Sequence, residues 1–399
     1  MKQKSKLWTK DFIMVSTSNF LLFISFYILI VTIAVYSIEE FHASQSQAGL
    51  ASSIFVLGAV FMRPIAGRMI ERVGKKNLLL LGLILFLVMT LFYFLVNNLA
   101  LLLVIRFFHG FALAISTTAT GTIVADIIPA ARRGEGMGYF ATSQNLAMAI
   151  GPFLGIYISQ NYEGNMIFIA TTIFSVVALI ATLFLRVPRS TFVPDNREAG
   201  GGFRLSDFFE KSTIGIGILV AILGFVYSSI LSFLNTYTAE INLVDAASFF
   251  FVMYAIFLLL SRPFTGQWFD RLGENAVIYP SLLLFGIGMF VLSQANAGIV
   301  LLFAGAIIGI GFGTFQSSAQ TVAINEAPRH RIGLATSTFF VFFDIGVGIG
   351  PFLLGMILPL IGFRGLYVGM ALLIFLSILV YYVVHGKKAA ARKKAAVEV

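Results

Sequence analysis

Apolar residues occur in long runs along this chain, and the polar residues between the runs occupy short gaps. A helix needs about 20 apolar residues to cross a bilayer core about 30 Å thick. The runs reach this length twelve times, so the pattern predicts twelve membrane-spanning helices. They are expected near residues 12–36, 47–69, 77–95, 99–123, 135–159, 165–186, 212–236, 246–267, 275–293, 298–322, 332–356 and 364–384.

The composition indicates the same class of protein. Hydrophobic residues make up 58% of the chain, charged residues 11%, and the mean hydropathy is +0.93. A soluble domain has about 45–50% apolar and about 25% charged residues, so a soluble enzyme is excluded. The chain has no cysteine, which removes disulfides, thiolate metal sites and cysteine nucleophiles. The four histidines, at positions 42, 109, 330 and 385, are scattered, so we expect neither a metal site nor any other cofactor.

The basic residues predict the orientation in the membrane. With the N-terminus placed inside, all but two of the 27 Lys and Arg residues fall on the inner side, and the exceptions are Arg106 and Arg364. Basic residues are retained on the cytoplasmic side of a membrane. We therefore expect a multi-pass protein of the plasma membrane with both termini in the cytoplasm. Its net charge of +9 then relates to the lipid bilayer and not to nucleic acid.

The chain contains an internal repeat with an offset of 199 residues. A motif that begins at Arg63 reappears at Arg262, and the stretch 129–154 aligns without a gap with 328–353. Six spans separate the copies, so both halves enter the membrane in the same direction and should be related by an axis along the membrane normal. The expected fold is an all-α integral membrane protein of two six-helix bundles. Its parts are an N-terminal half at 1–186, a cytoplasmic linker at 187–211 and a C-terminal half with a basic cytoplasmic tail at 212–399.

The repeated motif follows the second span of each half and combines glycines with charged residues. Glycine allows a tight turn and a close helix approach, and an acid with several bases can bridge helix ends. Loops that only set topology would not repeat this spacing, so we expect a conformational switch. Its residues are Gly67, Glu71, Arg72, Gly74 and Lys75 in the first copy, which Lys76 follows, and Gly266, Asp270, Arg271 and Gly273 in the second, where Glu274 and Asn275 replace the basic pair.

Two six-helix halves, a long linker and this loop resemble the major facilitator superfamily, whose signature loop reads Gly-x-x-x-Asp-Arg-x-Gly-Arg/Lys-Arg/Lys. The resemblance covers the whole chain, and Glu71 departs from it by replacing the usual Asp. It implies a transporter that rocks between two conformations around a central site.

The fifth span resembles the antiporter motif of the same family. Small residues there let helices of the two halves touch closely, and the proline bends the helix, so the resemblance implies an exporter. The alternative is ordinary close packing in a glycine-rich membrane protein. The matching residues are Gly138, Gly151, Pro152 and Gly155, while Ala147 and Ile156 replace two glycines of the motif.

Intramembrane charges are the candidates for proton coupling. Arg106 and His109 in the fourth span resemble the arginine motif of the family, which implies coupling of proton movement to conformation. The alternatives are an arginine that extends to the outer interface and a hydrogen-bonded core histidine. Asp344 lies near the middle of the eleventh span, where an ionised carboxylate is most costly, so it could load and release a proton. A structural pair with a neighbouring helix is the alternative for Asp344.

Further polar and aromatic residues lie at the depth where a central cavity is expected. They are candidates for substrate contacts: Tyr27, Tyr36, Phe140, Gln144, Asn145, Tyr227, Asn235, Tyr237, Gln316 and Gln320.

The expected function is secondary active transport by alternating access, with proton-coupled export of small amphipathic organic compounds. The chain has no Gly-x4-Gly-Lys-Ser/Thr loop, so ATP is not the evident energy source. Its partners are then a small-molecule substrate and protons, and we expect a monomer. One alternative is a proton-coupled transporter of a specific metabolite, such as a sugar, a siderophore or a lipid. A membrane-embedded enzyme or sensor is a further alternative, although paired intramembrane carboxylates or a soluble domain would be needed to favour it.

Overall fold

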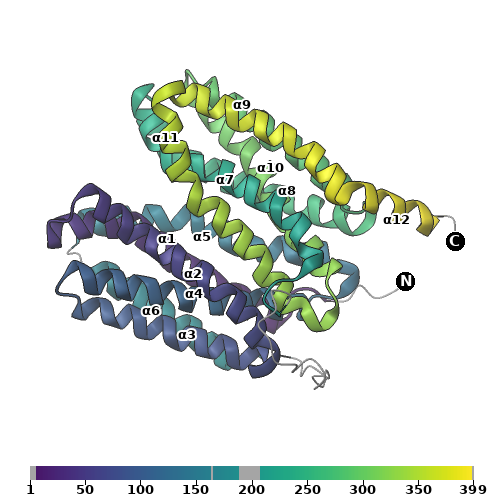
Figure 1. Cartoon of the computed structure of the whole chain (residues 1–399), viewed down its shortest axis with the longest axis horizontal. Coiled ribbons are helices and arrows are strands. Elements are labelled where there is room, and N and C mark those ends of the chain that lie inside the picture. The colour runs from purple at the N-terminus through teal and green to yellow at the C-terminus, as the bar shows by residue number, and fades with distance from the viewer. Residues whose placement is uncertain (1–5, 163–164, 188–206, 398–399) are drawn as a thin grey trace. The chain divides into compact units, whose positions relative to one another are not determined.

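The computed structural model describes residues 6–162, 165–187 and 207–397, and every regular element in this part of the chain is a helix (Figure 1). The expected linker at 187–211 falls mostly outside these residues. The helices of the first half are α1 (Lys10–Phe41), α2 (Gln45–Val73), α3 (Lys75–Phe92), α4 (Leu99–Ile127), α5 (Arg133–Asn161) and α6 (Asn165–Leu183). Those of the second half are α7 (Lys211–Glu240), α8 (Val244–Leu272), α9 (Asn275–Ser293), α10 (Gly298–Glu326), α11 (Ile332–Tyr381) and α12 (Lys387–Val397).

The helices agree with the predicted spans except at the C-terminal end. The spans expected at 332–356 and 364–384 are joined in α11, which is broken at Gly362 by a backbone φ of 67°. Glycine adopts this left-handed conformation readily, so two membrane helices meet at that residue. The basic tail, for which no helix was predicted, contains α12. In the described residues, ten stretches are long and apolar enough to cross a membrane, with both segments of α11 taken as one and α5 not included.

Local sequence signals explain where several helices begin. The side chain of Thr9 accepts a hydrogen bond from the backbone N–H of Phe12 at 3.2 Å, which caps α1. Ser44 and Gln47 form a reciprocal capping box at the start of α2. The turns between α2 and α3 and between α8 and α9 contain Gly74 and Gly273, whose φ values are 86° and 88°. These two glycines occupy equivalent positions of the repeat, and both turns need a residue without a Cβ atom.

The chain divides into two compact units that do not coincide with its two halves. Unit 1 contains 1–129, 143–210 and 327–341, and unit 2 contains 130–142, 211–326 and 342–399. The first part of α5 therefore packs with helices of the second half. The first part of α11 packs with helices of the first half.

Equivalent helices pair closely inside each unit. In unit 1, α4 packs against α2 and α3, and in unit 2, α10 packs against α8 and α9 (Figure 1). A Cβ atom at Gly110 of α4 would lie 2.0 Å from the carbonyl oxygen of Phe55, and one at Gly309 of α10 would lie 2.3 Å from that of Tyr254. These glycines let the paired helices approach to a distance that any side chain would prevent.

Candidate functional site

In unit 2, the second copy of the repeated motif binds the start of α5. Asp270, near the end of α8, accepts hydrogen bonds from the backbone N–H groups of Gly134 at 2.7 Å and Glu135 at 3.0 Å. The first N–H groups of a helix have no partner within the helix and carry a partial positive charge. A Cβ atom at Gly266 would lie 2.6 Å from the Cα atom of Glu135, so α8 and α5 also touch backbone to backbone. The acid and the glycine of the motif thus bind a helix of the other half of the sequence.

In unit 1, the first copy of the motif meets the start of α11 in a similar way. A Cβ atom at Gly67 would lie 2.6 Å from the Cβ atom of Ser337, and one at Gly333 would lie 3.3 Å from the carbonyl oxygen of Gly67. The hydroxyl of Ser337 donates a hydrogen bond to the carbonyl oxygen of Arg63 at 2.5 Å. The side chain of Glu71, part of the predicted switch, is outside the described structure.

The remaining charged residues of the motif separate into exposed and paired groups. Arg72 and Arg271 are exposed. Lys75 donates to the carboxylate of Asp126, at the end of α4 in the same half. Only some of the predicted switch residues therefore take part in the contacts that cross from one half of the sequence to the other.

Arg63 and Arg262 are buried cations that were not among the predicted site residues. Each is only 2% exposed, and they occupy equivalent positions of the repeat. Arg63 donates to the hydroxyl of Thr117 at 3.0 Å, and its guanidinium lies 4.6 Å from the centre of the Phe340 ring. The signal was present in the sequence, because a repeated Arg-Pro pair inside an apolar span is costly unless the arginine is bound.

The guanidinium of Arg262 joins three helices. It donates to the hydroxyls of Thr142 on α5 at 3.1 Å and of Ser317 on α10 at 2.5 Å, and to the carbonyl oxygen of Gly313 at 3.2 Å. Gly138 lies beside it, since a Cβ atom there would be 3.6 Å from the guanidinium. The planar guanidinium of Arg262 donates in several directions, and it can therefore fix the positions of α5, α8 and α10 relative to one another.

The predicted proton-coupling pair on α4 is fully buried. Arg106 donates from Nε to the carbonyl oxygen of Ala51 at 3.0 Å and from Nη2 to that of Ser52 at 3.4 Å, and its guanidinium lies 4.7 Å from the centre of the Phe55 ring. It is 0% exposed, which does not fit a side chain that extends to the membrane interface. Among the described residues, its Nη1 atom has no hydrogen-bond partner.

His109 lies beside Arg106 in an aromatic surrounding. Its Nδ1 atom is 3.0 Å from the hydroxyl of Tyr93, and its ring centre is 4.1 Å from that of Phe86 and 5.3 Å from that of Phe55. These contacts suit a histidine that positions Tyr93.

Asp344 and its repeat mate Asn145 have different environments. Asp344 is half-buried on α11 in unit 2, and Asn145 is 1% exposed on α5 in unit 1. The second half therefore has an ionisable group at a position where the first half has a neutral amide.

The glycines of the antiporter-type motif pack against two different helices. A Cβ atom at Gly151 would lie 2.5 Å from the Cβ atom of Tyr27, and one at Gly155 would lie 3.1 Å from the carbonyl oxygen of Ile28. Both neighbours belong to α1 of the same half. Only Gly138, beside Arg262, approaches a helix of the other half. Pro152 lies within α5, which continues on both sides of it.

The predicted cavity residues are mostly buried, and some have structural contacts. The hydroxyl of Tyr237 donates to the carbonyl oxygens of Leu292 and Ser293 at 3.1 and 3.3 Å, which ties α7 to the end of α9. Tyr227 stacks on Phe312 with ring centres 4.1 Å apart, and Tyr36 is half-buried against Phe168. The side chain of Asn235 is outside the described structure. The other candidates are 8% exposed or less: Tyr27, Phe140, Gln144, Asn145, Gln316 and Gln320.

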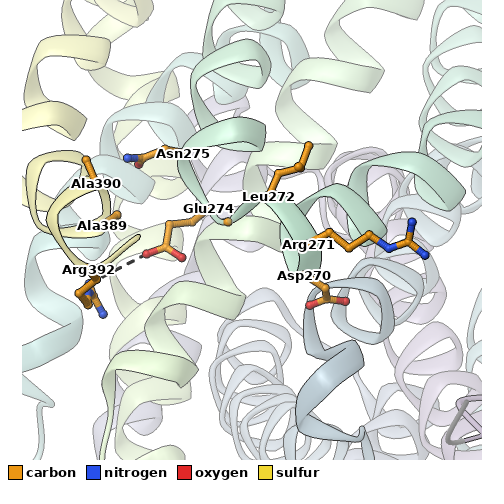
Figure 2. A pocket seen from close by; sticks show the side chains of 9 residues that line it. Asp270, Arg271, Leu272, Glu274, Asn275, Ala389, Ala390 and Arg392 are labelled. Carbon is orange, nitrogen blue, oxygen red and sulfur yellow. Dashed lines mark ion pairs between the residues drawn. The ribbon is translucent and has the colours of Figure 1, made fainter. Parts of the chain in front are cut away.

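A cavity of about 360 Å³ lies in unit 2 between the turn that joins α8 to α9 and the helix α12 (Figure 2). Asp270 and Arg271 line one end of it, and Glu274 and Arg392 line the other. A hydrogen bond with His385 lowers the pKa of Glu274 below its ordinary value, although partial burial opposes this shift. The cavity contains none of the predicted substrate residues, so the sequence pattern did not indicate it.

Long apolar helices in two repeated halves, with a glycine- and charge-bearing loop after the second helix of each half, define a multi-pass membrane transport protein. The chain belongs to the Major Facilitator Superfamily, because the sequence profile of that family matches residues 15–243 and 216–398. The family resemblance inferred from the signature loop is thereby confirmed, and so is the predicted all-α membrane fold. Members of this family are transporters rather than enzymes.

Individual relatives are distant in sequence. The chain is 25% identical to the uncharacterized MFS-type transporter MJ1560 of Methanocaldococcus jannaschii, over 84% of this chain and 87% of the relative. It is 23% identical to multidrug resistance protein 1 of Bacillus subtilis, over 82% of this chain and 85% of the relative. Among solved structures, the human organic anion transporter MFSD10 shares the fold with a TM-score of 0.75 at 15% identity, covering 93% of this chain and 98% of that one.

Proposed function

We propose that this protein is a secondary active exporter that moves small amphipathic organic compounds across the plasma membrane by alternating access. Similarity over most of the chain to a multidrug resistance protein supports export as the direction of transport. The antiporter-type residues on α5 support the same direction.

The main support for alternating access is that hydrogen bonds hold the starts of α5 and α11 to helices of the opposite half of the sequence. Asp270 and Arg262 bind α5, and Arg63 binds α11. Such contacts can break and re-form without loss of the helix pairs inside each half. Their release would open the side that carries the basic loops, which the positive-inside rule makes cytoplasmic. In this proposal both termini are cytoplasmic and the protein works as a monomer.

Proton entry would drive the cycle through Asp344, with Arg106 as a fixed cation. Asp344 is half-buried on α11, and in this cycle its carboxyl would meet water from one side of the membrane at a time. Burial favours the protonated form of a carboxyl, and access to water favours its ionisation. Arg106 is held by backbone carbonyl groups, and His109 keeps Tyr93 in place beside it.

A second candidate cargo is an organic anion. In the described structure, the buried guanidinium of Arg262 contacts hydroxyl and carbonyl groups and no carboxylate. When α5 leaves α8, the Nε–H group loses Thr142 and becomes available to an acidic group of a substrate. A buried cation of this kind binds anions better than cations.

Transport by the purified protein in proteoliposomes with an imposed pH gradient tests both cargo classes. We expect the substrate to move against its concentration gradient while protons move down their gradient in the opposite direction. The substrates would be lipophilic cations if the cargo is an amphipathic cation, and carboxylates if it is an organic anion. Asp344→Asn should abolish flux driven by the pH gradient and leave substrate exchange intact. Glu240→Gln, an exposed acid at the end of α7, is the matched control. Coupling equal to the unmodified protein in a well-folded Asp344→Asn variant would exclude Asp344 as the proton carrier.

A further inference from the structure

We propose that Glu274, Glu326 and His385 form a binding site for a divalent transition-metal ion, and that Arg392 fills this site with its own positive charge when no metal is bound. Nothing in the transport mechanism uses these residues. The site lies in unit 2, beside the cavity in Figure 2, where the turn before α9, the end of α10 and the turn before α12 meet.

The three side chains bring their ligand atoms close together from distant parts of the sequence. One carboxylate oxygen of each glutamate and one imidazole nitrogen of His385 all lie within 4.8 Å of one another. The Nε2 atom of His385 is 3.0 Å from the Oε1 atom of Glu274. A tetrahedral site with bonds of about 2.1 Å places its ligand atoms about 3.4 Å apart. Small side-chain movements are therefore enough to bind an ion.

The histidine is positioned by a specific local structure. His385 belongs to a π-helical turn at Tyr382–Gly386, and its side chain is 7% exposed. The Asn275 amide donates to the carbonyl oxygen of Gly386 at 2.9 Å, and the Tyr381 hydroxyl donates to the Asn275 amide oxygen at 2.7 Å. Single π-helical turns are frequent at functional sites. The turn therefore holds the imidazole in one orientation next to Glu274.

The fold does not require this set of residues. The repeat mates of Glu274, Glu326 and His385 in the first half are Lys75, Ile127 and Arg186, none of which can serve as a ligand in the same way. The first half folds into equivalent helices with these residues, so the acidic and imidazole ligands of the second half are not explained by packing.

Arg392 shows that the site attracts a cation. Its Nη1 atom is 2.5 Å from Glu326 Oε1, and its Nη2 atom is 4.0 Å from Glu274 Oε1. Figure 2 shows Arg392 facing Glu274 across the end of the cavity, with Ala389 and Ala390 on the same helix. The arginine side chain is 54% exposed, and exposed ion pairs contribute little net stability. A divalent ion with three ligands can displace it, and water in the cavity can supply a fourth ligand.

The ligand set selects the class of ion. One imidazole and two carboxylates suit Zn²⁺, Co²⁺, Ni²⁺ or Mn²⁺. Ca²⁺ and Mg²⁺ favour sites made of oxygen atoms alone, and Cu⁺ favours thiolates, which this chain lacks. The metal and Arg392 exclude each other, so metal binding would release the C-terminal helix α12 from the rest of unit 2.

Metal binding by the full-length purified protein tests the proposal directly. Co²⁺ absorption and Zn²⁺ competition give the affinity. Arg392→Ala removes the competing cation and should tighten binding at least about fivefold. Loss of a residue that only orients a metal ligand weakens metal binding about tenfold. Each direct ligand should matter at least as much, so we expect at least about tenfold weaker binding in the variants Glu274→Gln, Glu326→Gln and His385→Ala. Glu240→Gln should bind as the unmodified protein does.

A spin label on an introduced Ala391→Cys measures the release of α12, since the chain has no other cysteine. Zn²⁺ should increase the mobility of this label, and the increase should vanish when Glu274→Gln is added. The proposal would be overturned if the Arg392→Ala variant binds metal no more tightly than the unmodified protein. It would also be overturned if His385→Ala leaves the metal affinity unchanged. These results do not depend on any transport assay, so the proposed export function can fail while the metal site stands.

Discussion

The turn between α2 and α3 and the turn between α8 and α9 share one geometry but carry opposite charges. Lys76 donates to the carbonyl oxygens of Leu183 and Leu185 at 3.1 and 2.7 Å, at the end of α6. Its repeat mate Asn275 donates to the carbonyl oxygen of Gly386, at the equivalent end of the last membrane segment. In both halves this position binds backbone carbonyl groups near the end of the last membrane segment.

The preceding position differs in the sign of its charge. Lys75 pairs with Asp126 of its own bundle, whereas Glu274 pairs with His385 and Arg392 of the C-terminal segment. At these two positions the repeat therefore preserves backbone geometry and hydrogen bonding more strictly than charge. The acidic turn of the second half obtains its partners from the π-helical turn that contains His385 and from Arg392 of α12.

The paired helices α2–α4 and α8–α10 differ at another equivalent position. Arg106 of α4 corresponds to Gly305 of α10, where a Cβ atom would lie 2.8 Å from the carbonyl oxygen of Phe250. The second half uses this position for close packing, while the first half places a buried cation there. Four predictions test these differences.

Arg106→Lys should have the largest effect on transport. Lysine keeps the charge but lacks the planar donors that reach Ala51 and Ser52, so proton-driven flux should fall about tenfold or more, equivalent to about 1.4 kcal/mol or more. Initial rates in proteoliposomes at equal protein content measure this. Full activity of the lysine variant would mean that a positive charge alone is sufficient at this position.

Gly67→Ala and Gly266→Ala should destabilise the protein to a similar degree. Each new Cβ atom would lie 2.6 Å from an atom fixed to the opposing backbone, the Cβ of Ser337 or the Cα of Glu135. Overpacking of this kind costs about 1–3 kcal/mol. The apparent melting temperature in detergent measures it, with Gly369→Ala as the control, because nothing lies within 4 Å of a Cβ atom there. Melting temperatures equal to that of the control would show that these contacts are loose.

Asp270→Asn should favour release of α5. Asparagine removes the negative charge that faces two N–H groups of the helix start, and a change of about 1.4 kcal/mol would alter the ratio of docked and released states about tenfold. Labelling of a single cysteine at Ala141, which is 5% exposed, should become faster with a maleimide added from the basic-loop side. Asp207→Asn, which removes an acid that lies 3.7 Å from Arg68 in unit 1, should leave the rate unchanged.

Glu274→Gln should have the smallest effect, and it should depend on pH. The pKa of Glu274 lies below its ordinary value of 4.5, mainly because of the hydrogen bond with His385, so its ionised form stabilises the folded state. The stabilisation is complete above pH 4.5 and is lost as the pH falls through the lowered pKa. The side chain is 25% exposed, so the difference from the glutamine variant should be under about 1 kcal/mol. Melting curves from pH 7 down to pH 4 measure it, and a difference that grows toward acid would contradict the assignment.

The helices and the repeat could be predicted because they depend on runs of apolar residues and on a fixed offset within one sequence. Partners across the sequence could not be predicted in the same way. Asp270 binds backbone N–H groups, which leave no mark in the sequence, and Gly151 gives no indication that its neighbour is Tyr27 of α1. The pairing of Glu274 with His385 joins residues 111 positions apart that belong to no common motif. The basic tail pattern predicted charge but not the helix α12.

The exchange of helix ends between the two halves has a consequence for biosynthesis. Unit 1 includes residues 327–341, and the hydrogen bond from Ser337 to Arg63 joins residues 274 positions apart. At a synthesis rate of about 5–20 residues per second, the surface of α2 beside Gly67 stays uncovered for roughly 14–55 s before Ser337 is made. During that time the first six helices are already in the membrane with this glycine-lined surface uncovered. The last helices to be inserted therefore complete the packing of the first ones, and a nascent chain that stalls before residue 337 holds an unfinished unit 1.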